Sequence, residues 1–187
     1  MVSLSSLLLP IILSAVFVFI VSSIIHMMLP YHRSDRAKLT REDDALEALR
    51  RLNIPPGDYM APHPGSPEGM RKPEFVEKMR TGPVVLMTLT PGGSTSMTKS
   101  LVLWFIYSII VSVFAGYIGS RALAPGAHYL SVFRFVGTTA FMAYGLALAQ
   151  DSIWYHRKWS TTLKSMFDAL LYGMFTAGTF GWLWPKM

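Results

Sequence analysis

The stretch LSSLLLPIILSAVFVFIVSSIIHMML, residues 4–29, contains no charged side chain and is followed by Pro30. Helical residues rise about 1.5 Å each, so these 26 residues exceed the roughly 30 Å hydrocarbon core of a bilayer and would cross it at a tilt. The stretch has neither the basic start nor the small-residue cleavage site of a secretory signal peptide. It therefore predicts a transmembrane helix that is not cleaved off.

Three further apolar stretches have the length of a membrane span. Residues 100–120, 129–150 and 163–184 contain 21 or 22 residues each, and 51% of the chain is hydrophobic. Because a soluble chain of this size seldom carries so much apolar sequence, we expect an all-α integral membrane protein with a bundle of four transmembrane helices. Its parts are the first helix at residues 1–29, a proline-rich segment with short helices at 30–99, and a three-helix region at 100–187.

The distribution of basic residues predicts the orientation of these helices. Basic residues follow the first span and lie between the third and fourth, at Arg33, Arg36, Lys38, Arg41, Arg157 and Lys158. The short segments of the opposite side have only Arg121 and Lys186. Since basic loops are retained on the cytoplasmic side, we expect an inner-membrane protein with both termini periplasmic and residues 30–99 cytoplasmic.

The segment of residues 30–99 holds 9 of the 12 prolines and 9 of the 11 acidic residues. It should contain a helix that starts with Thr40 as its N-cap and stops before Pro55. The apolar positions of this helix recur at helical spacing and are Ala45, Leu46, Leu49 and Leu52. A face this small does not fold alone, so it must cover the membrane surface, the helix bundle or another protein.

The rest of this segment alternates turns with short regular elements. From Pro55 to Pro73 we expect an extended chain rich in turns, because prolines and glycines recur. Pro73 favours the start of a second short helix, residues 74–80, which Gly82 ends. Residues 84–90 are typical of a strand.

Three of the four predicted spans carry small residues three or four positions apart, which allow helices in lipid to approach closely. They are Ser108, Ser112, Gly116 and Ser120 in the second span, Gly137, Ala140, Ala143 and Ala147 in the third, and Ala169, Gly173, Ala177 and Gly181 in the fourth. We expect these stripes to pack the bundle internally, or one of them to bind a partner helix. The first span lacks such a stripe and is expected to face lipid or a partner.

Asp168 is the most unusual ionisable residue, because a charged side chain within a membrane span is costly. It follows the start of the fourth span by about five residues, and Lys164 lies one helical turn earlier, where it can pair with it. Arg134 is similarly close to the opposite end of the third span. Ion pairing and snorkelling account for these charges. A role of Asp168 in proton transfer or substrate binding is the alternative.

Sequence motifs for a reaction or a cofactor are missing. The chain has no cysteine, which excludes thiolate metal sites, and only His26 of its five histidines lies within a span. Residues 93–100 resemble a phosphate-binding loop, but Thr98 replaces its second glycine. The net charge of +6 is not accompanied by a nucleic-acid-binding module. We therefore expect no enzyme activity, cofactor, metal, nucleotide or nucleic acid. The expected partners are membrane lipids and other membrane-protein subunits.

Three stretches carry a resemblance: PPGDYMAPHP at residues 55–64, GPVVLMTLTPGG at 82–93 and DSIWYHRKWSTTLKSMFDALLYGMFTAGTFGWLWP at 151–185. In them the chain resembles a family of small bacterial four-span inner-membrane proteins that has no assigned activity. The resemblance implies a bacterial origin and the four-span topology. It implies no role for any residue.

The leading hypothesis is a non-catalytic accessory subunit that packs against a larger inner-membrane complex, for which energy-transducing assemblies (photosynthetic or respiratory) are the commonest hosts. An alternative is a membrane protein that handles protons or a small molecule through Asp168, with Lys164 and Gln150 or Asp151. A third hypothesis is lipid binding at the inner leaflet by the helix after Thr40 and the loop at residues 154–159.

Overall fold

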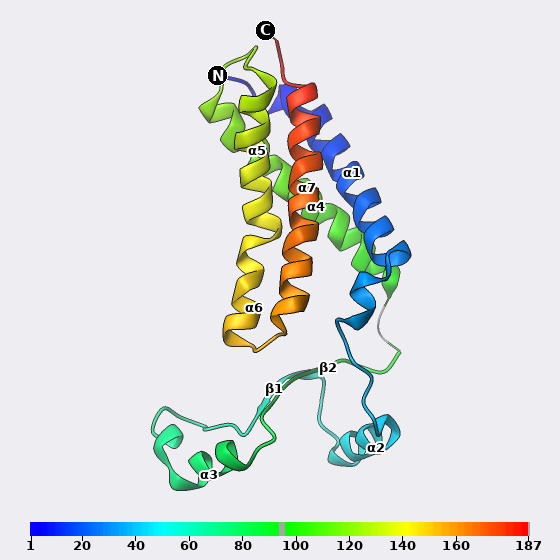
Figure 1. Cartoon of the computed structure of the whole chain (residues 1–187), viewed down its shortest axis with the longest axis vertical. Coiled ribbons are helices and arrows are strands. Elements are labelled where there is room, and N and C mark those ends of the chain that lie inside the picture. The colour runs from blue at the N-terminus through cyan, green and yellow to red at the C-terminus, as the bar shows by residue number, and fades with distance from the viewer. Residues whose placement is uncertain (94–95, 187) are drawn as a thin grey trace. The chain divides into compact units, whose positions relative to one another are not determined.

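The computed structural model describes residues 1–93 and 96–186, which form two compact units (Figure 1). Residues 1–37 and 96–186 make up the helical unit, and residues 38–93 make up the inserted unit. Residues 94 and 95, which belong to the stretch that resembles a phosphate-binding loop, lie outside the described residues.

The helical unit contains four long helical segments, of which the third is interrupted (Figure 1). Its elements are η1 (Ser5–Leu7), α1 (Leu8–Met28), η2 (Pro30–Ser34), α4 (Met97–Ala122), α5 (Tyr129–Tyr144), η4 (Leu146–Leu148), α6 (Ala149–Trp154) and α7 (Trp159–Trp182). The interruption falls at Gly145, where α5 ends and η4 and α6 continue the segment.

Among the described residues, three helical segments are long and apolar enough to cross a membrane: Ser5–Met28, Met97–Ala122 and Tyr129–Trp154. In length and composition they match three of the four predicted spans. The fourth predicted span is present as α7, which is a helix of 24 residues. It is less apolar than the others, because Lys164 and Asp168 lie in its first half.

Small side chains bring α5 and α7 close together. A methyl group built on Gly137 would lie 2.9 Å from the Cβ of Ala177, and one built on Gly145 would lie 2.5 Å from the Cβ of Ala169. Close approach of this kind maximises van der Waals contact, which is the main attraction between helices in lipid. The small residues of α7 therefore pack inside this chain, and Gly181 lies against the ring of Tyr129 in the same interface.

The stripe of α4 is also internal, because Ser108, Ser112, Gly116 and Ser120 are all buried. The stripe predicted for the third span is used only in part. Ala143 and Ala147 are exposed. The buried positions of α5 are spaced by four and include Ala140 and Tyr144. Ala143 is not one of these positions, and α5 ends before Ala147.

One face of α1 packs inside the helical unit, although this helix carries no stripe of small residues like those of the other three spans. Ser14 and Ser22 are buried on one face of α1. The Ser14 hydroxyl donates a hydrogen bond to the Ser112 hydroxyl over 3.0 Å, and Trp104 Nε1 donates to the Ser22 hydroxyl over 2.8 Å. Two serines eight residues apart lie on the same side of a helix, so α1 joins α4 through hydrogen bonds as well as apolar contact.

The inserted unit consists of short elements around a two-stranded sheet. They are α2 (Glu42–Leu52), β1 (Gly57–Ala61), η3 (Gly69–Arg71), α3 (Pro73–Thr81) and β2 (Val85–Leu89). The strands are antiparallel, with Gly57 opposite Leu89 and Ala61 opposite Val85. The predicted second helix and the strand at residues 84–90 are confirmed. The predicted all-α class holds for the helical unit alone, because the inserted unit contains a two-stranded sheet. Its strand β1 lies in the stretch that was expected to be extended and rich in turns.

The predicted N-cap of α2 was wrong. Arg41 occupies that position, and its side chain does not cap the helix. The first turn carries Glu42, Asp43 and Asp44 instead, whose negative charges stabilise the positive end of the helix dipole. At the other end, Asn53 adopts the left-handed conformation, with φ 47°, that commonly terminates helices.

Candidate functional site

The candidate site forms where the chain leaves α1. A proline restricts the residue before it to extended conformations, and Leu29 accordingly ends the helix with φ −86° and ψ 136°. Pro30 then opens η2, because its fixed φ suits the first position of a helical turn. This turn brings Tyr31 and His32 against Asp168 of α7.

His32 lies between two carboxylates. Its Nδ1 is 2.6 Å from Oδ2 of Asp35, and its Nε2 is 2.7 Å from Oδ2 of Asp168. A protonated His32 would donate from both nitrogens to these carboxylates and form an ion pair with each of them. The side chains of His32 and Asp168 are only 13% and 3% exposed, so salt screens this ion pair little.

Tyr31 completes the hydrogen bonding of Asp168. Its phenol donates to Oδ1, the carboxylate oxygen that faces away from His32. Partial burial and this hydrogen bond to a negative charge raise the pKa of Tyr31. Tyr31 therefore keeps its proton at all physiological pH values and acts as a fixed donor.

Lys164 of α7 forms a second set of hydrogen bonds with the chain at η2. Its Nζ donates to the carbonyl oxygen of Tyr31 over 2.6 Å, to Ser34 Oγ over 2.9 Å and to Asp35 Oδ1 over 2.9 Å. Burial alone would raise the pKa of Asp35, but hydrogen bonds and charge from His32 and Lys164 outweigh it and hold that pKa below its ordinary value. Asp35 is therefore ionised at neutral pH.

Tyr31, His32, Asp35, Lys164 and Asp168 are called the aspartate–histidine cluster below. Its two carboxylates lie against the ammonium group of Lys164 and the imidazole ring of His32. Each carboxylate receives hydrogen bonds from two of these side chains. This arrangement satisfies groups that would otherwise be costly to bury.

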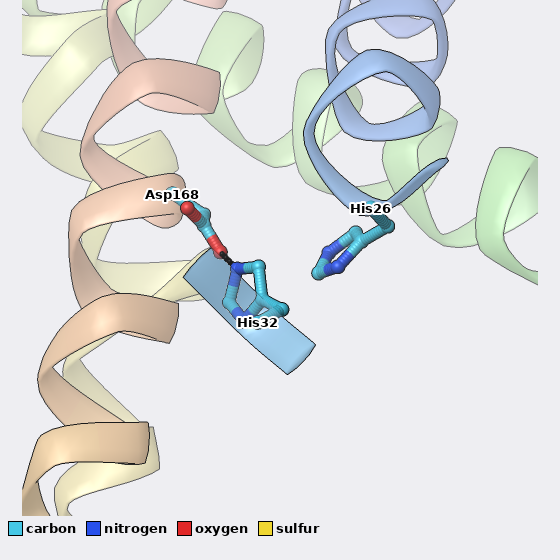
Figure 2. A group of neighbouring side chains, drawn as sticks. All are labelled: His26, His32 and Asp168. Carbon is cyan, nitrogen blue, oxygen red and sulfur yellow. Dashed lines mark hydrogen bonds and ion pairs between the residues drawn. The ribbon is translucent and has the colours of Figure 1, made fainter. Parts of the chain in front are cut away.

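His26 stands at the edge of this cluster. It lies in the last turn of α1, and its ring centroid is 4.6 Å from that of His32. One ligand atom each of His26, His32 and Asp168 lie within 4.8 Å of one another. Figure 2 shows the three side chains converging from α1, η2 and α7. His26 is exposed, and its imidazole ring forms no hydrogen bond within the described residues.

No family model, curated protein or solved structure matches this chain. What the chain does is therefore inferred from the aspartate–histidine cluster and from the surfaces of its two units.

The ionisable residues singled out in the sequence do not form the ion pairs that were expected of them. Asp168 is buried, with 2% of its surface exposed. Lys164 pairs with Asp35, and among the described residues it makes no ion pair with Asp168. Asp151 pairs with Arg157 on the exposed side of α6, and not with the cluster. Arg134 is exposed in α5, where no described side chain pairs with it.

Sequence reasoning missed the contributions of Tyr31, His32 and Asp35, and it treated the histidines as scattered. The spacing of His32 and Asp35 was a usable signal, because residues three apart face each other in a helical turn. The approach of His26 to His32 had no comparable signal. The two rings meet because Pro30 turns the chain sharply after α1.

Replacing Lys164 with methionine should lower the unfolding free energy of the helical unit by about 2 kcal/mol, the usual contribution of hydrogen bonds to a partly buried charge. The variant keeps the hydrophobic stem of the side chain but loses all three bonds to η2 and the charge opposite Asp35. The measurement is equilibrium unfolding in mixed micelles with increasing dodecyl sulfate. The matched control is Lys158→Met at the start of α7, where the side chain is exposed. Equal effects of the two variants would contradict a role of Lys164 in holding η2.

Proposed function

We propose that the chain is a non-catalytic accessory subunit of a larger inner-membrane complex, anchored by the helical unit and bound to its partner through the inserted unit. The observation that carries this proposal is the lack of a core in residues 38–93. Within that range Gly69 is the only buried residue. Small domains without disulfides or metals are marginal even with a core, because they bury so little apolar surface.

The inserted unit exposes an unusual amount of apolar surface for its size. Its largely exposed apolar side chains are Leu39, Leu46, Leu52, Met60, Met70, Val76, Met79, Val84 and Leu86. Removing apolar surface from water contributes about 25 cal/mol per Å², so these side chains favour association with another molecule. A protein partner that covers these side chains would supply the missing core.

The face of α2 is the most regular part of this surface. Leu46 and Leu52 are 42% and 66% exposed, and Ala45 and Leu49 lie between them on the same side of the helix. The opposite side is charged. A helix of this kind inserts its apolar face into a groove of a partner, in the way that amphipathic helices are generally recognised.

We also propose that α7 crosses the membrane as a fourth span, with residues 30–99 in the cytoplasm. At about 1.5 Å per residue its 24 residues are as long as the hydrocarbon core is thick. Its charged residues are paired near one end. In Figure 1 the start of the chain lies at the same end of the helical unit as the end of α7, where Trp184 donates to the carbonyl of Ala124. An even number of crossings places both ends of the chain on the same side of the membrane. The basic residues after α1 favour the cytoplasmic side for residues 30–99.

The partner interaction is tested by a pair of substitutions in α2. Leu46→Glu places a negative charge in the apolar face, whereas Arg51→Glu places one on the charged side, about 140° around the helix from Leu46 and at least about 100° from every apolar position. Tagged chains are purified from gently solubilised native membranes. We expect the wild type and Arg51→Glu to recover a stoichiometric membrane-complex partner, and Leu46→Glu to lose at least about tenfold of it, which is 1.4 kcal/mol.

Recovery of every variant as a lone monomer or homo-oligomer would overturn the proposal. Equal recovery of a partner by both variants would exclude α2 as the contact. Binding of the purified chain to vesicles of anionic lipid, lost in Leu46→Glu, would assign the face to the lipid surface instead.

A second candidate function is proton transfer through the aspartate–histidine cluster. It is favoured by the continuous hydrogen-bonded path from Asp168 through His32 to Asp35, with Tyr31 as a fixed donor to Asp168. Paths of this kind conduct protons in membrane proteins. Vesicles loaded with a pH-sensitive dye should then take up protons faster with the wild type than with Asp168→Asn. Equal rates would exclude this function.

A further inference from the structure

Three side chains of the types that bind transition metals converge at the end of α1. His26, His32 and Asp168 each offer a ligand atom within 4.8 Å of the others. Two of them already touch, since His32 Nε2 lies 2.7 Å from Asp168 Oδ2. The third, His26, is directed toward this pair (Figure 2) and has no hydrogen bond within the described residues to hold it elsewhere.

We propose that His26, His32 and Asp168 form a binding site for a divalent transition-metal ion. Such ions bind about 2.0–2.1 Å from imidazole nitrogens and carboxylate oxygens, which puts neighbouring ligand atoms roughly 3.3 Å apart in a tetrahedral site. The distance between His32 and Asp168 opens slightly to reach this value. Rotation of the exposed His26 ring closes the remaining distance.

The groups around these ligands are those that metal sites use. A metal-binding histidine usually donates its other nitrogen to a carboxylate, which fixes the ring and its tautomer. Asp35 holds that position on Nδ1 of His32, and Lys164 holds Asp35 in turn. The phenol of Tyr31 donates to the second oxygen of Asp168, leaving Oδ2 directed at the histidine.

The ligand set selects the class of ion. Two imidazoles and one carboxylate suit Zn²⁺, Fe²⁺ and similar ions, whereas Mg²⁺ and Ca²⁺ require oxygen ligands. The ion would replace the proton that His32 Nε2 shares with Asp168, so the neutral imidazole binds it. Three protein ligands leave one tetrahedral position to a water molecule. Because Asp168 is buried, an ion bound to it would have little contact with bulk solvent.

The site is tested with Zn²⁺ and Co²⁺ on the full chain in detergent micelles, after treatment with a chelator. Zn²⁺ affinity is measured by competition with a chromophoric chelator, and Co²⁺ binding by its visible absorption, which reports the coordination geometry. The decisive variant is His26→Ala, because it removes an exposed ligand and none of the hydrogen bonds of the cluster. The control is His63→Ala, an exposed histidine of the inserted unit.

We expect one Zn²⁺ per chain and visible bands of four-coordinate Co²⁺. Asp35→Asn should weaken Zn²⁺ binding by about 10- to 100-fold, the effect typical of outer-shell changes, and His26→Ala should weaken it by more than about 100-fold. His63→Ala should leave affinity and spectrum unchanged. Binding that is not saturable, or that is the same in His26→Ala, would overturn the site. So would a Co²⁺ spectrum without tetrahedral bands.

Discussion

Replacing Asp168 with alanine is expected to lower the unfolding free energy of the helical unit by about 3 kcal/mol, the cost of removing one partner from a buried ion pair. The carboxylate is 2% exposed and accepts hydrogen bonds from Tyr31 and His32. Without it, Nε2 of His32 and the phenol of Tyr31 both lose their hydrogen-bond partner in a site with little access to water. The measurement is equilibrium unfolding in dodecyl sulfate mixtures, with a chelator present.

Two further substitutions separate the charge from the hydrogen bonds. Asp168→Asn keeps an acceptor for Tyr31 and a donor for a neutral His32, so it should cost less than Asp168→Ala. Asp151→Ala removes a carboxylate whose ion pair with Arg157 is 3.4 Å long and about 40% exposed, and it should cost less than about 1 kcal/mol. If Asp168→Ala were as mild as Asp151→Ala, the cluster would contribute nothing to holding η2 on α7.

Replacing Gly137 with leucine is expected to destabilise the helical unit by about 3 kcal/mol, at the upper end of typical overpacking effects. Even a methyl group at this position would lie 2.9 Å from the Cβ of Ala177. A Cβ atom moves only when its helix moves, so the leucine must separate α5 from α7. The same unfolding measurement reports the loss.

The control for this substitution is Gly178→Leu on α7. A methyl group there would meet its nearest neighbour, the hydroxyl of Tyr129, at an ordinary 3.6 Å. The position borders a hollow on the helical unit, into which a leucine fits. Because leucine favours helix over glycine by nearly 1 kcal/mol, this variant should be neutral or slightly stabilised. Loss of stability equal to that of Gly137→Leu would show that the α5–α7 contact is not specifically tight.

The fold was predictable where local rules decide it. Pro30 ends α1 through its effect on Leu29, and Pro73 and Gly82 bound α3, because these residues restrict the backbone directly. Strand β1 was harder to predict. Its sequence, Gly57–Ala61, lacks the alternation of a strand, and its structure depends on pairing with β2.

The candidate site was predictable only in part, because it depends on contacts between distant segments. Asp168 stood out as a charge in a span, and the helical spacing of Lys164 suggested that the two would pair. Lys164 instead reaches Asp35, which is 129 residues away in the chain. Local spacing rules describe a helix surface in water, but here η2 docks onto that surface and offers Lys164 three oxygen acceptors.

The central claim is that a protein partner covers the inserted unit, and hydrogen exchange tests it most directly. Backbone amides of α2 and of the two strands are compared in gently solubilised native membranes, in the purified chain, and in the purified chain with anionic lipid vesicles. We predict slow exchange in the native extract alone, with fast exchange in the other two samples, because a unit with no core opens easily unless a partner holds it. Equally fast exchange in all three samples would contradict the claim.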